Sequence, residues 1–196
     1  MARRNRSISV GIALAVFCVP LAGCGDEQQR NYALPESFCG LDLSVKKYAP
    51  VFAPGERIEA EYNRRWGDRE ERSSQGCRYF VDGNIAVDVS GDWRRSDEKA
   101  LPADPMAALA RYSGADPRPY PGRFGAATRR GGAAAVLKCS PAKSGGPDRF
   151  HLDISVNAYK FAQDWDEARE PLGKLVQAAM AKVEARLPCK GKKPPA

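Results

Sequence analysis

The chain has 196 residues and a formal net charge of +7, and three of its basic residues lie among the first six positions. The remaining basic residues are interleaved with acidic ones, so the sequence predicts no nucleic-acid binding. A single histidine excludes most metal sites and most pairs of a nucleophile with a base.

The N-terminus has the form of a bacterial export signal. Arg3, Arg4 and Arg6 precede an apolar run over residues 8–22, which is shorter than the roughly 20 residues needed to span a bilayer. The run ends in Leu21-Ala22-Gly23-Cys24, which resembles the lipobox of bacterial lipoproteins, where the cysteine is lipidated and the chain is cut before it. We therefore predict lipidation of Cys24. The alternative is an ordinary secretory signal and a released protein.

This signal divides the chain into four parts. We predict a signal peptide over residues 1–23, a lipidated flexible stalk over 24–38, one domain over 39–189 and a basic tail over 190–196. The mature chain then has 28 basic and 24 acidic residues, a formal charge of +4, and is long enough for one core. Its lipid would hold it at the extracytoplasmic face of the cell membrane.

The predicted domain holds four cysteines, and export would place them in an oxidising compartment where two disulfides can form. Four cysteines allow three pairings. Their placement favours Cys39 with Cys77 and Cys139 with Cys189, because each terminal cysteine then fastens a chain end to an interior strand. A zinc site is disfavoured, since 37, 61 and 49 residues separate successive cysteines and zinc sites use closely spaced pairs.

A β-hairpin is predicted around Asp82-Gly83. The flanking runs, Cys77–Val81 and Asn84–Trp93, hold alternating apolar residues, and Asp-Gly suits the positive φ angles of a type I′ turn. The stretch Arg57–Trp66 fits both a strand and a helix period, and we favour a strand.

A second pair of strands is predicted over Ala133–Cys139 and Arg149–Tyr159. Apolar and polar residues alternate along the second of these. The stretch Asp116–Gly132 is rich in proline and glycine, which predicts a loop.

Two helices complete the prediction. The first covers Pro105–Tyr112 with Asp104 as its cap, and the second covers Leu172–Leu187, where apolar residues recur at spacings of three and four before Pro188. Together the elements predict an α+β fold, a two-layer sandwich in which an amphipathic C-terminal helix covers an antiparallel β-sheet.

Few side chains indicate chemistry. His151 falls on the polar face of its strand, so it is predicted to be solvated rather than catalytic. Asp88 and Asp92 share the face of another strand and could act as acid and base, but a solvated sheet face explains them more simply.

Other residues have competing interpretations. Trp66, Trp93 and Trp165 could line a glycan-binding or other ligand-binding face, although Trp93 and Trp165 are predicted to pack inside. Arg129-Arg130-Gly131-Gly132 could bind an anion, although a turn before a strand is favoured.

The lipobox, the opening Phe38-Cys39-Gly40-Leu41, the stretch Gly76-Cys77-Arg78 before the hairpin, and a last helix ending at Cys189 resemble small actinobacterial cell-surface lipoproteins of unknown function. The resemblance implies an α+β sandwich like that of the photosystem accessory protein PsbP and the nuclear transport factor Mog1. It supplies no catalytic residues.

The sequence therefore predicts a non-enzymatic binding or accessory module of the cell envelope. Its expected partners are the membrane, through the lipid, and an envelope protein or small ligand, and no cofactor or metal is predicted. Two alternatives remain: an exported envelope hydrolase that uses carboxylates, and a carrier of an apolar ligand in a space between sheet and helix.

Overall fold

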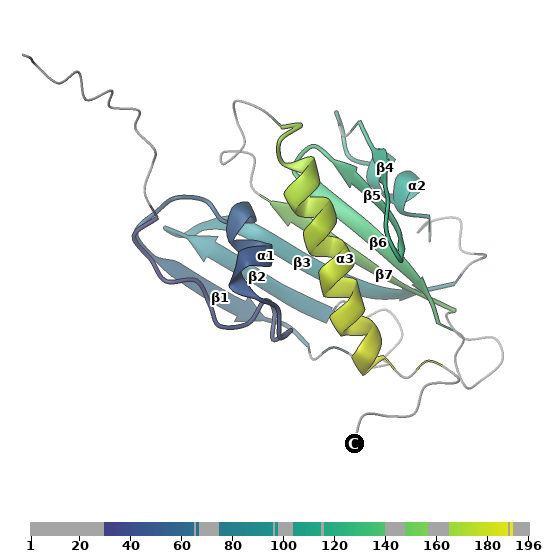
Figure 1. Ribbon diagram of the computed structural model, residues 1–196, viewed down its shortest axis with the longest axis horizontal. Helices are drawn as coiled ribbons and strands as arrows, with labels where there is room; N and C mark the ends of the chain where they lie inside the picture. Colours follow the sequence, from purple (N-terminus) through teal and green to yellow (C-terminus); the bar gives the residue numbers. More distant parts are fainter. Residues whose placement is uncertain are drawn as a thin grey trace, which may run out of the picture.

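The computed structural model describes residues 30–64, 66, 75–95, 97, 104–114, 116–139, 148–156, 165–187 and 189. The predicted signal peptide, Cys24 and the predicted basic tail lie outside these residues. Seven strands form one antiparallel sheet in the order β1-β2-β3-β7-β6-β5-β4 (Figure 1). The strands are β1 (Ile58–Tyr62), β2 (Gln75–Val81), β3 (Asn84–Arg94), β4 (Arg118–Tyr120), β5 (Gly125–Arg129), β6 (Gly132–Lys138) and β7 (Arg149–Val156).

One face of the sheet is covered by the long helix α3 (Arg169–Arg186), as Figure 1 shows. Phe150, Leu152 and Ile154 of β7 point to this face and are fully buried. The apolar stripe of α3 packs against them, and it consists of Leu172, Leu175, Val176, Ala179, Met180 and Val183. The structure is therefore an α+β sandwich of an antiparallel sheet and a C-terminal helix, as predicted.

The N-terminal part of the chain covers the other end of the same face. It includes the short helices α1 (Val45–Tyr48) and η1 (Ala49–Val51), and α1 contacts α3. Phe38 and Phe52 contact the ring of Tyr79 on β2 at centroid distances of 5.8 and 5.1 Å. These aromatic contacts continue the core that lies between α3 and the sheet as far as β1 and β2.

Among the described elements, the helix α2 (Pro105–Ala110) is the one that packs on the opposite face of the sheet. Its Leu109 is fully buried against Ala127 of β5 and Ala134 of β6. Asp104 caps the helix by accepting a hydrogen bond of 2.9 Å from the backbone N–H of Ala107, as predicted. Since α2 has six residues, it covers only part of this face.

The predicted hairpin is confirmed. Asp82 and Gly83 join β2 to β3 with φ angles of 51° and 78°, the positive values that a type I′ turn requires. The strand favoured over Arg57–Trp66 is present as β1, and the second predicted strand pair is present as β6 and β7. The predicted end of the latter, residues 157–159, lies outside the described residues.

The loop predicted over Asp116–Gly132 is wrong, because β4 and β5 lie within it. Strand β5 is rich in small residues and gains its extended form from pairing with β6, which sequence periodicity does not reveal. Strand β4 tolerates Pro119 because it is three residues long and forms the edge of the sheet.

The predicted stalk over residues 24–38 extends too far into the domain. Arg30 donates hydrogen bonds to the carbonyls of Ala49 and Phe52, at 2.8 and 3.0 Å, and Tyr32 donates one to the carbonyl of Ala53. Phe38 is fully buried. Residues 30–38 are thus part of the fold. A flexible stalk would therefore have to end before residue 30.

Two disulfides fasten the ends of the chain to the sheet. Cys39 is bonded to Cys77 on β2, and Cys139 after β6 is bonded to Cys189 beyond α3. This is the pairing that the placement of the cysteines favours. Such bonds persist in oxidising compartments and indicate an extracytoplasmic protein. Among the described helices, none has the length and apolarity needed to cross a membrane.

Candidate functional site

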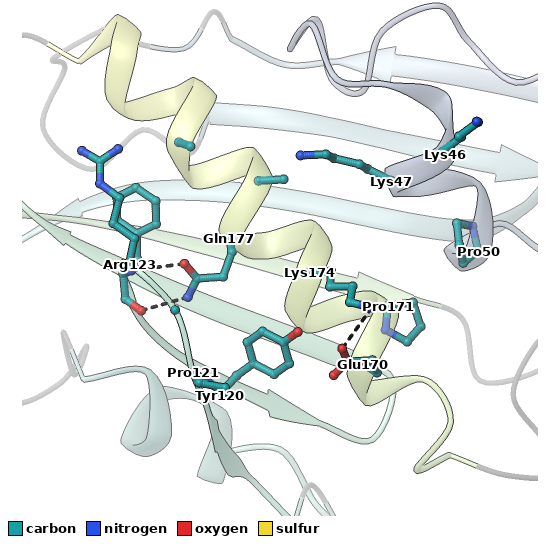
Figure 2. Close-up of a pocket in the computed structure, with 14 residues that line it drawn as sticks. Lys46, Lys47, Pro50, Tyr120, Pro121, Arg123, Glu170, Pro171, Lys174 and Gln177 are labelled. Carbon is teal, nitrogen blue, oxygen red and sulfur yellow. Dashed lines mark hydrogen bonds and ion pairs between the residues drawn. The ribbon is translucent and has the colours of Figure 1, made fainter.

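An open groove of about 760 Å³ crosses the outer side of α3 (Figure 2). Lys46, Lys47 and Pro50 bound it on the side of α1 and η1. The segment from Tyr120 to Phe124, which joins β4 to β5, bounds it on the other side. Residues far apart in the sequence therefore meet on the surface of one helix.

The lining of this groove is mainly apolar. The ring of Tyr120 packs directly on Gly173 of α3, where an added Cβ would lie 2.2 Å from a ring carbon. Burial raises the pKa of the Tyr120 hydroxyl, and the nearby carboxylate of Glu170 raises it further. The hydroxyl therefore stays neutral at ordinary pH. Phe124, Pro171, Ala178 and Ala181 supply further apolar surface.

A side chain of α3 fixes the far wall of the groove. Gln177 accepts a hydrogen bond of 3.1 Å from the backbone N–H of Phe124 and donates one of 2.9 Å to the carbonyl of the same residue (Figure 2). A single amide thus satisfies both backbone groups of Phe124. The segment between β4 and β5 is held at a set distance from the helix.

The charge around the groove is mostly positive. Four cationic side chains line it against one carboxylate, that of Glu170. Glu170 pairs with Lys174 at 3.1 Å, and Arg123 pairs with Glu184 at 2.7 Å. Lys46 and Lys47 are exposed and have no carboxylate partner among the described residues, and Lys47 extends toward α3 in Figure 2.

His151 does not lie where the sequence predicts, and the expectation of a solvated side chain is wrong. It is 1% exposed on the face of the sheet that α2 partly covers. Burial and the neighbouring Arg94 lower the pKa of its imidazole to about 3, so the ring is neutral at ordinary pH. Strand alternation assigned the correct face, but it could not show that this face is covered.

The two aspartates that share a strand face, Asp88 and Asp92, do not form one site. Asp88 is half-exposed and pairs with Arg78 at 3.2 Å. Asp92 lines a polar pocket of about 360 Å³ together with His151 and Asp153. Burial raises the pKa of both Asp92 and Asp153, although Arg94 opposes the effect at Asp92 and Arg129 opposes it at Asp153.

Two of the three tryptophans contact the core instead of lining one ligand-binding face. Trp66 is 8% exposed and donates a hydrogen bond of 2.8 Å from its Nε1 to the carbonyl of Cys39. Trp66 and Trp93 both meet the ring of Phe150 edge-on. Trp165 is partly buried just before α3.

The arginine-glycine stretch is a turn, as favoured. Arg129 and Gly132 are paired residues of β5 and β6, and Gly131 between them has a φ of 68°. The guanidinium of Arg129 lies 4.0 Å from the centre of the Tyr112 ring and donates a hydrogen bond of 2.7 Å to Ser155 Oγ.

The groove residues were missed at the level of sequence. Tyr120 and Phe124 fall in the stretch that predicts a loop, and the four-residue α1 is too short to give a periodic signal. The polar, outward side of α3, with Glu170 and Lys174, was the one available sign of this surface. Its partners could be found only in the tertiary structure.

Comparisons with protein-family models, curated proteins and solved structures find no match to this chain. The resemblance to actinobacterial lipoproteins and to the PsbP and Mog1 sandwich thus stays a prediction. Within the described part of the chain, no group of three or more potential ligands could hold a metal ion.

Proposed function

We propose that this protein is a lipoprotein, anchored through Cys24 at the extracytoplasmic face of the cell membrane, that acts as a non-enzymatic binding module of the envelope. The lipobox at Leu21 to Cys24 and the two disulfides support the location. The groove across α3 is its binding surface.

The groove is suited to an anionic phospholipid. Its apolar lining offers contact for hydrocarbon, and its excess of cationic side chains offers contact for phosphate. Lys46 and Lys47 are central to the proposal because no described carboxylate neutralises them. The pairing of apolar surface with these two free cations is the observation that carries the proposal.

The position of the groove agrees with a membrane ligand. Arg30 lies six residues after Cys24, a distance that an extended chain spans in about 20 Å. Its guanidinium is bonded to the carbonyls of Ala49 and Phe52, on either side of the groove residue Pro50. The groove would therefore stay close to the headgroups of the membrane that holds the anchor.

Vesicle flotation tests the groove. The mature chain from Gly25 onward, made without lipid, retains every buried core residue, since these lie between Phe38 and Leu187. It should bind vesicles that contain phosphatidylglycerol more tightly than vesicles of phosphatidylcholine alone. The double substitution Lys46→Gln and Lys47→Gln should weaken that binding about thirtyfold, because each lysine near an anionic surface contributes about 1 kcal/mol.

A matched control has the same loss of charge elsewhere. Arg57→Gln and Lys138→Gln remove two exposed cations that do not line the groove. This pair should weaken binding much less. Equal losses in the two double variants would mean that net charge alone governs binding, and the groove proposal would fail.

The anchor has a separate test. Mass spectrometry of the membrane-extracted protein should give a chain that begins at Cys24 and carries acyl groups, and Cys24→Ser should abolish both. Recovery of a soluble mature protein with an unmodified cysteine would support the ordinary secretory signal instead.

An exported hydrolase is the second candidate, because Asp92 and Asp153 line one pocket and burial raises the pKa of both carboxyls. This candidate predicts release of nitrophenol from aryl glycosides or aryl esters and loss of that release on Asp153→Asn. We favour binding, because the buried imidazole in the same pocket has no hydrogen-bond partner among the described residues that would orient it for catalysis.

A further inference from the structure

A polar pocket lies on the face of the sheet away from the groove. Neighbouring strands β3 and β7 place two pairs of side chains on this face, Asp92 opposite His151 and Ser90 opposite Asp153. All four line a pocket of about 360 Å³, and Tyr112, just beyond α2, also lines it. The volume is at the lower end of the range for small-molecule sites.

The imidazole of His151 is the unusual feature of this pocket. Its side chain is buried, and neither Nδ1 nor Nε2 has a hydrogen-bond partner in the described part of the chain. A neutral imidazole has one N–H donor and one acceptor nitrogen, and leaving such groups unpaired inside a protein is unfavourable. A ligand with a hydroxyl could pair with either nitrogen.

The other polar groups define the chemistry of that ligand. Asp92 and Asp153 accept hydrogen bonds, whereas Arg94 and Arg111 donate them. Two carboxylates and two guanidiniums give the lining no formal net charge. An anion would face both aspartates and a cation would face both arginines, so neither is favoured over an uncharged ligand.

Neighbouring contacts hold the acceptors in place. Asp153 accepts a hydrogen bond of 3.0 Å from Ser155 Oγ, and Ser155 accepts one of 2.7 Å from Arg129. The carboxylate of Asp92 lies 3.6 Å from the guanidinium of Arg94. The acceptors are thus held by the fold before a ligand arrives.

We propose that this pocket binds a small, uncharged, polyhydroxylated molecule, of the size of a single sugar ring or a cyclic polyol, with one of its hydroxyls paired to His151. Each hydroxyl both donates and accepts, which matches the mixture of carboxylates, guanidiniums and imidazole. The site is distinct from the groove across α3, and the inference does not depend on the lipid proposal.

The single histidine makes a direct test possible. In the mature chain labelled with ¹⁵N-histidine, all imidazole signals come from His151. Titration with glucose, galactose or myo-inositol should shift these signals in a saturable manner for at least one of the three. Inorganic phosphate at the same concentrations should leave them unchanged.

Matched variants locate the binding. Asp153→Asn should weaken polyol binding, as measured by this titration, about tenfold, because it replaces a charged hydrogen-bond acceptor with a neutral one. Asp88→Asn changes an aspartate of the same sheet face that does not line the pocket, so its titration should match that of the unsubstituted protein. Absence of any polyol-dependent shift would overturn the proposal, as would a response to phosphate alone or equal weakening in the two variants.

Discussion

The two faces of the sheet are built from the same strands but are buried in different ways. On β7, Phe150, Leu152 and Ile154 meet the apolar stripe of the eighteen-residue helix α3. The alternate residues His151 and Asp153 point to the other face, where α2 has six residues. One face is closed by apolar packing, whereas the other is only partly covered and remains polar.

Because of this difference, alternate side chains of β7 have different roles: one set stabilises the fold and the other set does not. Apolar burial on the α3 face stabilises the fold, since each buried aliphatic side chain contributes about 1.5–3 kcal/mol. Unpaired polar groups on the α2 face are unfavourable instead, by about 1–3 kcal/mol each. A buried group that weakens the fold indicates a role other than packing.

The largest effect is expected from removing the disulfide that links the segment after α3 to the end of β6. The double substitution Cys139→Ala and Cys189→Ala removes a cross-link between residues 50 positions apart. The unfolded chain then gains entropy, and the free energy of unfolding should fall by about 4 kcal/mol. Urea denaturation measures this change. A loss below about 1 kcal/mol would show that packing alone holds the helix.

A matched pair of leucines compares the two faces directly. Leu152 and Leu109 are both fully buried, but Leu152 belongs to the main core and Leu109 to a small cluster with Ala127 and Ala134. Leu152→Ala should lower the free energy of unfolding by about 3–4 kcal/mol and Leu109→Ala by about 2 kcal/mol, since the small cluster can relax into the space. Denaturant midpoints of the two variants give the difference. The reverse order would contradict this ranking of the faces.

The pH dependence of His151 sharpens the comparison. The folded protein depresses the pKa of His151 to about 3, so the imidazole takes up a proton on unfolding at any pH between that value and its ordinary 6.5. Proton uptake by this residue therefore has no effect on stability above about pH 6.5, but it increasingly favours the unfolded chain as the pH falls from there toward about 3, so the protein loses stability over that range. In His151→Leu this loss disappears.

At about pH 7.5, His151→Leu should be more stable than the unsubstituted protein by about 1 kcal/mol, because two unpaired nitrogens are removed. At about pH 5 this difference in the free energy of unfolding between the two proteins should grow by about a further 2 kcal/mol. Asp92 and Asp153, whose raised pKa values act in the opposite direction, are present in both proteins. Urea unfolding at the two pH values measures the gap, and a constant gap would show that His151 is not protonated on unfolding.

The smallest effect is expected at the start of α2. Asp104→Ala removes the cap of this helix and should lower the free energy of unfolding by about 1 kcal/mol. Asp42→Ala is the control, because the side chain of Asp42 is 95% exposed and its ion pair within the described part of the chain is with Lys182, at 3.5 Å. Its effect should stay within about 0.5 kcal/mol. Thermal unfolding of both variants checks the pair, and equal effects would argue against the cap.

Much of the fold could be predicted from local signals. Asp82-Gly83 marked a hairpin because few residue pairs tolerate two positive φ angles, and the spacing from Leu172 onward marked α3 because only one side of the helix is apolar. Strand β5 escaped prediction, since its alanines and glycine favour no structure without β6 beside them. The groove and the polar pocket escaped for the same reason.

The sequence alone determined the number of cysteines and the alternation that assigns His151 and Phe150 to opposite faces of β7, and it is the basis for predicting an export signal with a lipobox. These features depend on neighbours in the chain. The tertiary structure decided that His151 would be buried on the polar face, that Lys47 would face α3, and that Tyr120 would rest on Gly173. Burial and charge at these positions arise from residues distant in sequence, which come together only when the sheet and its helices pack.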